Sequence, residues 1–225
     1  MEKIKNIKFI ASKSSGEVSG IIYLPKNSIG FYVFAHGAGA PMNHPFMNNA
    51  AEYLAEERIG TLRYNFPYSE KKKKYIDPAP ILMETVRSAI NSAKDYIGDI
   101  PLFAGGKSMG GRMTSQAAAK EMLDDVKGLI FYGFPLHAPG KDSTERGEHL
   151  YKIDIPMLFL QGTRDKLANL ELLKPIINKV GKNASIQIIE GADHSFKVLK
   201  SLGRTEEQIQ RDLAHKIRQW IEKNI

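Results

Sequence analysis

The hydrophobic pattern of this chain changes character near residue 30. Apolar and polar residues alternate over 4–10 and again over 18–24, with a turn-like Ser-Ser-Gly sequence at 14–16 between them, which predicts an antiparallel hairpin. The segment 31–35 is then apolar at every position, a pattern typical of a strand that is covered on both faces. The chain is therefore expected to begin with a hairpin and to continue into a buried sheet.

Helical and strand-like segments alternate through the rest of the chain. Apolar residues at helical spacing predict helices over 47–55, 82–97, 113–117, 170–180 and 205–220. Short apolar runs predict strands over 60–64, 102–104, 126–132, 156–160 and 186–189. The last helix begins with the capping-box sequence Thr205-Glu206-Glu207-Gln208. Because strands that alternate with helices build βαβ units, we expect an α/β fold with a mostly parallel central sheet and helices on both faces.

Length and composition favour one globular domain inside the cell. Residues 1–225 contain no internal repeat or linker, are 42% hydrophobic and are expected to form a single domain. The absence of cysteine excludes disulfides, thiolate metal sites and a thiol nucleophile, and it fits a reducing compartment. The chain starts with alternation instead of the apolar segment of a signal peptide, and no apolar run approaches the ~18 residues that span a bilayer. We therefore expect a soluble cytoplasmic protein with no membrane partner.

The charge balance is basic. Lysine and arginine number 32 against 25 aspartate and glutamate, and this net charge of +7 can attract anionic substrates, nucleic acid or lipid. The run Lys71 to Lys74 is interpreted first as a solvated loop. The alternative is a basic ring that the run forms with Lys107, Lys166 and Lys197 at the mouth of an active site. Because no recognition motif accompanies the run, no nucleic-acid partner is expected.

A glycine-flanked serine follows the predicted strand 102–104. Its Gly-Lys-Ser-Met-Gly sequence has the spacing of a nucleophile elbow. Gly106 and Gly110 are needed because the strand turns sharply into a helix there, while Ser108 takes a strained backbone conformation that projects its hydroxyl outward. The N–H of Met109 would then lie at the start of a helix, where an oxyanion is favoured.

Two later strand ends supply possible partners for this serine. Asp165 follows the predicted strand 156–160, and His194 follows the predicted strand 186–189. Functional loops of a parallel sheet lie beyond the carboxyl ends of its strands, so the serine, the acid and the histidine are expected at one edge. Asp193 is a second candidate for the acid. Neighbouring residues on a tight loop rarely point at each other, so Asp165 is favoured.

With these motifs in the order Ser, Asp, His, the sequence resembles the α/β-hydrolase superfamily over essentially its whole length. The His-Gly-Ala-Gly sequence at 36–39 is similar to the family's oxyanion loop. The chain is most similar to the small, lid-poor branch of serine hydrolases near the dienelactone-hydrolase-like proteins, although a dienelactone hydrolase proper has a cysteine nucleophile where this chain has Ser108. The segment between Phe134 and Ile155, where many relatives insert a cap domain, is short and polar and implies a minimal cap.

The resemblance implies a catalytic triad in this α/β-hydrolase fold. Ser108 would attack an acyl carbon, His194 would carry the proton, and Asp165 would orient the histidine. The expected substrate is a small acyl compound, above all a small carboxylester, and no cofactor or metal is expected. The alternative is a catalytically weak scaffold or binding protein that keeps the fold and presents a basic surface. The sequence predicts neither the substrate-binding residues nor the oligomeric state.

The resemblance also implies an oxyanion hole. The backbone N–H groups of Met109 and Ala38 would form it, and Gly39 competes with Ala38 as the second donor. His36 is expected to shape the loop by hydrogen bonding and not to transfer protons. Arg112, just inside the helix after the elbow, is expected to pack or to form an ion pair more readily than to bind substrate.

Other motifs in the chain are weaker. His44, His137 and His149 have no metal-ligand spacing, so solvated or pocket-wall positions are expected for them. The Gly-Lys-Ser sequence of the elbow resembles the end of a phosphate-binding loop, but Pro101 occupies the position of that motif's first glycine. Nucleotide hydrolysis is therefore not favoured.

Overall fold

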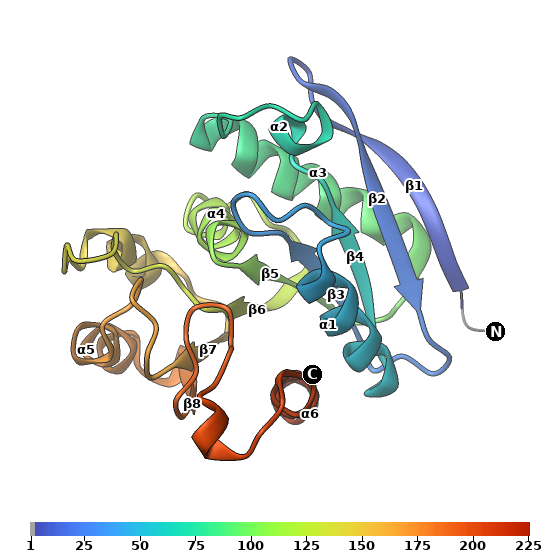
Figure 1. Ribbon diagram of the computed structural model, residues 1–225. Coiled ribbons are helices and arrows are strands. Elements are labelled where there is room, and N and C mark those ends of the chain that lie inside the picture. The colour runs from blue at the N-terminus through green and yellow to red at the C-terminus, as the bar shows by residue number, and fades with distance from the viewer. Residues whose placement is uncertain (1–2) are drawn as a thin grey trace.

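The computed structural model describes residues 3–225 and is built around one eight-stranded sheet (Figure 1). The strands are β1 (Lys3–Ser12), β2 (Gly16–Leu24), β3 (Gly30–Ala35), β4 (Ile59–Tyr64), β5 (Leu102–Lys107), β6 (Val126–Tyr132), β7 (Met157–Gly162) and β8 (Ala184–Ile189). Their order in the sheet is β1-β2-β4-β3-β5-β6-β7-β8. The first two form an antiparallel hairpin, β2 is antiparallel to β4, and all neighbours from β4 to β8 are parallel. The predicted hairpin and mostly parallel sheet are confirmed.

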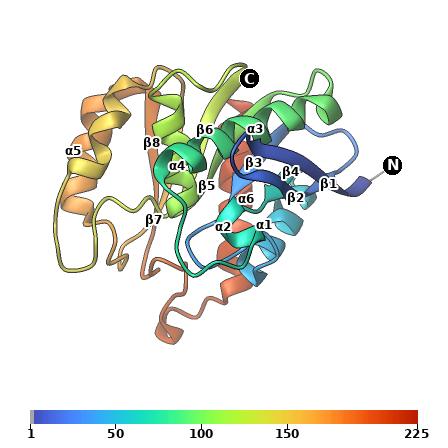
Figure 2. The same cartoon turned by 90° about the horizontal axis from the view of Figure 1, so that it is seen from above.

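Helices cover both faces of the sheet, as predicted (Figure 2). The α-helices are α1 (Pro45–Glu56), α2 (Pro67–Glu70), α3 (Ala79–Ile97), α4 (Met109–Ala118), α5 (Leu170–Val180) and α6 (Glu206–Glu222). The 3-10 helices are η1 (Glu145–Lys152), η2 (Gly181–Asn183) and η3 (Lys200–Leu202). α1 and α6 pack on one face of the sheet, and α3 and α4 pack on the other. No helix within 3–225 is long and apolar enough to cross a membrane.

The apolar run of β3 explains how one strand serves two cores. All six residues of β3 are buried. Phe31 and Val33 join the core beneath α3 and α4, while Tyr32 and Phe34 join the core beneath α1 and α6. Successive side chains of a strand point to opposite faces, so a strand between two helical layers needs an apolar residue at every position.

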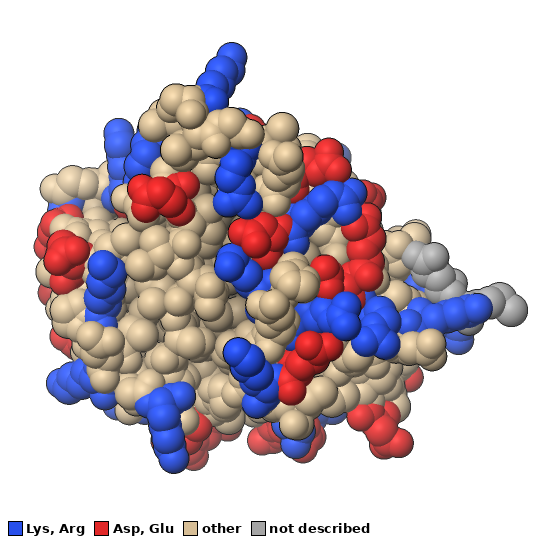
Figure 3. Space-filling view, turned by 90° about the horizontal axis from the view of Figure 1, so that it is seen from below, with Lys and Arg blue, Asp and Glu red and all other residues tan. Residues whose placement is uncertain are grey.

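Ion pairs connect the last helix, α6, to the first helix, α1, and to the residue that follows it. Thr205 closes the predicted capping box at the start of α6. Arg211 forms an ion pair with Glu56 of α1, and Arg218 forms one with the neighbouring Glu57. Positive and negative side chains are interspersed on the face seen in Figure 3. The net positive charge is therefore not gathered into a single basic patch on that face.

Candidate active site

Ser108 forms the turn between β5 and α4. Its backbone has φ 50° and ψ −117°, a conformation that residues other than glycine rarely adopt. The Ser108 N–H donates to the Tyr132 carbonyl oxygen on the neighbouring strand β6 at 3.0 Å, which holds the turn against the sheet. The strained serine expected from the sequence is therefore present at the carboxyl end of a buried strand.

Close backbone contacts explain the glycines around this serine. A Cβ atom on Gly106 would collide with the Ala35 carbonyl oxygen at the end of β3, and one on Gly110 would come within 2.6 Å of the same oxygen. A Cβ atom on Gly37 would lie only 3.6 Å from the Cβ of Ser108. The loop between β3 and α1 therefore runs directly beside the serine.

Three side chains from three different loops form a continuous hydrogen-bonded chain. Ser108 Oγ lies 2.8 Å from His194 Nε2, and His194 Nδ1 lies 2.7 Å from Asp165 Oδ2. The His194 side chain is 24% exposed, whereas the Asp165 side chain is 1% exposed, so the carboxylate is the buried end of the chain. The structure thus brings together the serine, histidine and aspartate that the sequence singled out.

The surroundings of Asp165 fix its carboxylate as an acceptor. Gln161 Nε2 donates to Oδ2 at 2.5 Å, and the Leu167 N–H donates to Oδ1 at 2.8 Å. The rival carboxylate of Asp193 instead accepts two backbone N–H groups of its own loop, at 2.8 and 3.0 Å. Asp165 faces the histidine, and Asp193 shapes the loop that carries it.

Lys107, which the sequence placed only in a possible basic ring at the mouth of the site, is instead buried beside these groups. Its Nζ is buried and donates to the His194 carbonyl oxygen at 2.6 Å. A Cβ atom on Gly133 would lie 3.2 Å from this Nζ, 3.3 Å from His194 Nδ1 and 3.4 Å from Asp165 Oδ2, so the three groups converge on one point. Burial lowers the pKa of Lys107 to about 8, although the charges of Asp165 and Asp193 act to raise it. The sequence feature that points to Lys107 is its position between Gly106 and Ser108 in the elbow.

His36 holds the loop between β3 and α1 from beneath. The ring is fully buried, its Nδ1 lies 2.7 Å from the Gly37 carbonyl oxygen, and its Nε2 accepts the Phe66 N–H at 3.2 Å. This pattern assigns the proton to Nδ1 of a neutral ring. Burial lowers the pKa of His36 to about 4. The ring therefore positions the backbone of Ala38 and Gly39 by hydrogen bonding, in the manner expected from the sequence.

The buried His36 predicts a loss of stability in acid. The unfolded chain takes up a proton near pH 6.5, whereas the folded protein resists protonation down to about pH 4. We expect the free energy of unfolding to fall by about 3 kcal/mol from this group between those two pH values. Denaturant titrations should show a shallower pH dependence for His36→Gln, but not for His215→Gln on the exposed face of α6. An unchanged slope in His36→Gln would contradict the prediction.

The three candidate oxyanion donors lie around the serine. Met109 is the first residue of α4, and Ala38 and Gly39 line the same cavity as Ser108. Burial raises the pKa of the Tyr68 phenol, and the backbone N–H of Gly39 partly offsets this increase. The Tyr68 hydroxyl is buried without a hydrogen-bond partner among residues 3–225, so its surroundings do not separate Ala38 from Gly39 as the second donor.

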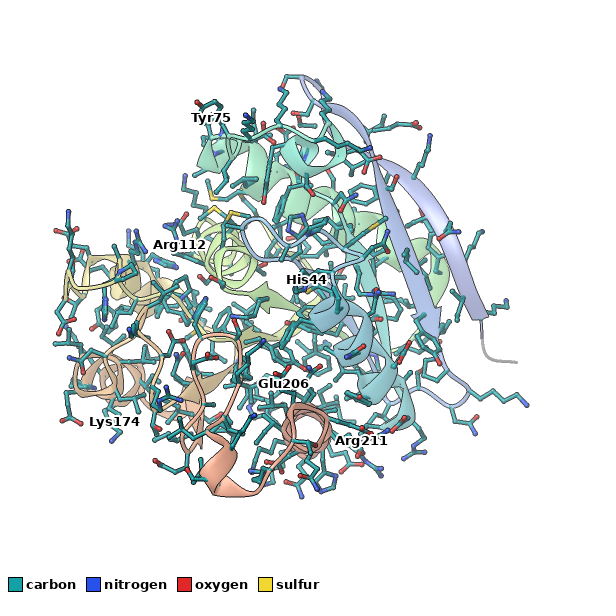
Figure 4. The ribbon with its side chains drawn as sticks, viewed as in Figure 1. His44, Tyr75, Arg112, Lys174, Glu206 and Arg211 are labelled. Atoms are coloured by element: carbon teal, nitrogen blue, oxygen red, sulfur yellow. The ribbon has the colours of Figure 1, made fainter. Side chains whose placement is uncertain are left out.

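A cavity of about 730 Å³ opens in front of Ser108 and His194. His44 and Glu206 line it from the β3–α1 loop and from the start of α6, and both are labelled in Figure 4. The other lining residues include Phe46, Met47, Leu167, Ser195 and Gln210. The wall is thus partly apolar, and the segment between Phe134 and Ile155 folds into η1 and loops.

Lysines contribute less to this cavity than the basic-ring hypothesis requires. Lys107 and Lys197 line it, whereas Lys166 and the run Lys71 to Lys74 do not. The run is exposed, and Lys71 Nζ donates to the Ser15 carbonyl oxygen at 2.8 Å in the β1–β2 turn. The lysine run therefore belongs to the hairpin side of the molecule, which agrees with the favoured interpretation as a solvated loop.

The remaining histidines are held by local contacts. His137 is buried and accepts the Asn169 N–H at 2.8 Å, so it is not solvated. His149 lies on η1, where its Nε2 is 2.8 Å from Ser115 Oγ. Among residues 3–225, no group of three or more histidine, aspartate or glutamate side chains is arranged to hold a metal ion.

A comparison with protein families bears on this geometry. A family model described as an alpha/beta hydrolase domain matches residues 29–222. The chain belongs to the alpha/beta hydrolase family. The match to this hydrolase family includes the β3–α1 loop, the turn at Ser108 and the loops that carry Asp165 and His194. The fold expected from the sequence is confirmed.

Solved structures share the fold of this hydrolase domain. A dienelactone hydrolase from Anabaena variabilis superimposes with a TM-score of 0.77 at 18% identity, covering 100% of this chain and 99% of the other. An α/β serine hydrolase without a lid from Xanthomonas campestris has a TM-score of 0.73 at 17% identity, with 97% and 95% covered. An esterase from Pyrococcus furiosus has a TM-score of 0.78 at 14% identity, with 99% and 91% covered. At these identities the likeness extends to the fold alone.

Proposed function

We propose that this protein is a serine hydrolase that cleaves small carboxylesters through an acyl-enzyme on Ser108. The observation that carries the proposal is the unbroken hydrogen-bonded chain from Ser108 through His194 to Asp165 at the wall of a cavity. A nucleophile in contact with a base, and a base oriented by a buried acid, form the arrangement that activates a serine hydroxyl. Membership of the alpha/beta hydrolase family supports the same reaction class.

The reaction follows from the positions of the atoms. As Ser108 Oγ bonds to the ester carbonyl carbon, its proton passes to His194 Nε2, and the buried Asp165 carboxylate stabilises the resulting imidazolium. Collapse of the tetrahedral intermediate breaks the bond to the alcohol, which leaves with that proton. Water then attacks the acyl-enzyme: His194 takes a proton from the water as its oxygen bonds to the acyl carbon. When the bond to Ser108 Oγ breaks, that proton passes from His194 to Oγ and the acid departs.

We assign the oxyanion hole to the N–H groups of Met109 and Ala38. Met109 opens α4, where the helix dipole favours a negative charge. Ala38 is proposed as the second donor and Gly39 remains its competitor, since both line the cavity beside Ser108. The loop that carries Ala38 is held in place by the hydrogen bonds of His36, so this donor needs little reorganisation when the oxyanion forms.

Small esters are proposed as substrates because of the cavity and the minimal cap. A volume of about 730 Å³ lies within the range of sites for small molecules. Only η1 and loops occupy residues 134–155, where a cap domain would stand, so this segment adds no cap domain over the cavity. We expect short acyl chains to be turned over faster than long ones.

Labelling with a fluorophosphonate tests the proposed nucleophile directly. The wild type and Ser195→Ala, which alters a neighbouring serine of the same cavity, are expected to gain one adduct that mass spectrometry maps to Ser108. Ser108→Ala is expected to gain none. A folded wild type that takes no label would support the scaffold alternative, and an adduct on another serine would reject the assignment.

We further predict that Lys107 influences the pH dependence of turnover. Its ammonium lies close to both His194 and Asp165, so its charge disfavours a second cation on the imidazole. In Lys107→Met the protonated imidazole becomes more stable, and a protonated imidazole cannot accept the serine proton. The rising limb of kcat/KM should therefore move to higher pH. The exposed Lys197, which also lines the cavity, provides the matched control Lys197→Met. If Lys107→Met lowers the rate but leaves the rising limb of kcat/KM at the wild-type pH, Lys107 has only a structural role.

A further inference from the structure

Beyond the triad, an arginine-rich contact joins α4 to η1. Ser115 Oγ lies 2.8 Å from His149 Nε2 and donates to the Arg112 carbonyl oxygen at 2.9 Å. Arg112 and Ser115 are three residues apart on α4, so they share the helix face that meets η1. Arg146 and His149 are also three residues apart, and side chains at that spacing eclipse in a 3-10 helix. The two arginines therefore lie on facing surfaces, and Figure 4 shows Arg112 leaving α4 on the side of η1.

These two arginines have no counter-ion. Neither guanidinium forms a hydrogen bond or an ion pair with any other side chain in the part of the chain that the structure describes. The Nε atom of Arg112 is buried without a partner. The nearby glutamates of η1, Glu145 and Glu148, are exposed and unpaired. A buried donor without a partner is costly, so this arrangement is incomplete on its own.

The titration of the neighbouring groups agrees with an excess of positive charge. Burial lowers the pKa of Arg112, and the charge of Arg146 lowers it further. Burial also lowers the pKa of His149 to about 4, with Arg112 adding to the effect. The histidine is therefore neutral near pH 7, and the two guanidiniums are the cations of the contact. Of the two roles expected for Arg112 from the sequence, packing or an ion pair, the ion pair is not formed within residues 3–225.

We propose that Arg112 and Arg146 bind a carboxylate or phosphate group carried by the substrate. A planar guanidinium offers paired donors that match the oxygens of either group. The backbone N–H of Arg112 donates to the Ser108 carbonyl oxygen at 3.1 Å, so the backbone of Arg112 lies one helical turn after the nucleophile, while both guanidiniums lie outside the lining of the cavity in front of Ser108. A substrate with its ester at Ser108 therefore has to extend beyond this cavity, toward η1, for its anionic group to reach the two guanidiniums. This inference rests on the proposed esterase function.

Matched esters test the substrate part of the inference. We would compare p-nitrophenyl esters whose acyl chains of four to six carbons end in a carboxylate with neutral esters of equal length. Loss of one charge-assisted hydrogen bond should cost about 10- to 100-fold in kcat/KM. Arg112→Met and Arg146→Met are therefore expected to lose that factor for the carboxylate esters and to keep wild-type rates for the neutral esters. Arg87→Met removes an equal charge from the exposed face of α3 and should change neither.

A binding measurement separates this site from the catalytic reaction. Inorganic phosphate at constant ionic strength should raise the melting temperature of the wild type, of Ser108→Ala and of Arg87→Met, but not of Arg112→Met. It should also compete with carboxylate esters more strongly than with neutral ones. If the wild type hydrolyses no ester, the proposed function fails, and the phosphate shift still decides whether the arginines bind an anion. A phosphate shift with equal rates for charged and neutral esters overturns the substrate assignment, and no shift overturns the site.

Discussion

Ser108→Ala is expected to lose roughly 10³-fold or more of the esterase rate while folding normally. The hydroxyl is the only group at the end of β5 that His194 Nε2 contacts, so without it no acyl-enzyme forms. Initial rates with p-nitrophenyl acetate, together with far-UV circular dichroism, would measure the loss and check the fold. Ser195→Ala is the control in the same cavity, and a Ser108→Ala variant of near wild-type activity would reject the mechanism.

The same position carries a separate prediction for stability. The positive φ of Ser108 is unfavourable for serine and for alanine, but not for glycine. We therefore expect Ser108→Gly to be inactive and yet more stable than the wild type by about 1 kcal/mol, whereas Ser108→Ala should have wild-type stability. Denaturant midpoints measure the difference. Equal stability of all three proteins would mean that the turn is not strained.

Asp165→Asn is expected to lower kcat by about 10³- to 10⁴-fold. The amide that replaces the carboxylate has one oxygen and one NH₂ group. In the wild type the Leu167 N–H donates to one carboxylate oxygen and Gln161 Nε2 donates to the other. With the oxygen facing Leu167, the NH₂ faces His194 Nδ1, and that nitrogen must accept instead of donate. The proton then moves to Nε2, which can no longer take the proton of Ser108.

Asp193→Asn is the matched control because it alters the adjacent carboxylate of the same loop. Its two acceptor contacts are both with backbone N–H groups at one oxygen, and an amide oxygen can accept both. We expect near wild-type turnover. Strong inactivation of Asp193→Asn beside an active Asp165→Asn would reverse the assignment of the acid.

The sequence predicted the parts of the site that depend on local chemistry. Glycines around a serine identify a turn because only a missing side chain fits there, and the contacts of Gly106 and Gly110 show why. The preference for Asp165 over Asp193 followed from the short reach of neighbouring side chains. Apolar runs likewise predicted the buried strands, since a strand between two helical layers has no polar face.

What the sequence did not predict depends on contacts between distant segments. Lys107 is buried because a glycine, Gly133, follows β6 beside it and the loop after β8 passes over it, which no local pattern records. The alternative that placed the lysine run at the mouth of the pocket rested on topology alone, and the loop instead returns to the β1–β2 turn. Among the described residues Arg112 forms no ion pair, because the segment that faces it supplies a second arginine, 34 positions further along the chain.

The position of β8 at the edge of the sheet gives the site unequal local stability. β5, which ends at Ser108, is buried along its whole length between two strands, whereas β8 has a neighbour on one side only and is mostly half-exposed. Edge segments with few buried contacts open at lower free energy than the centre of a sheet, and amide hydrogen exchange reports such openings. Because His194 follows β8, a partial opening at this margin would remove the base while the nucleophile stayed in place. Inactivation can therefore precede global unfolding.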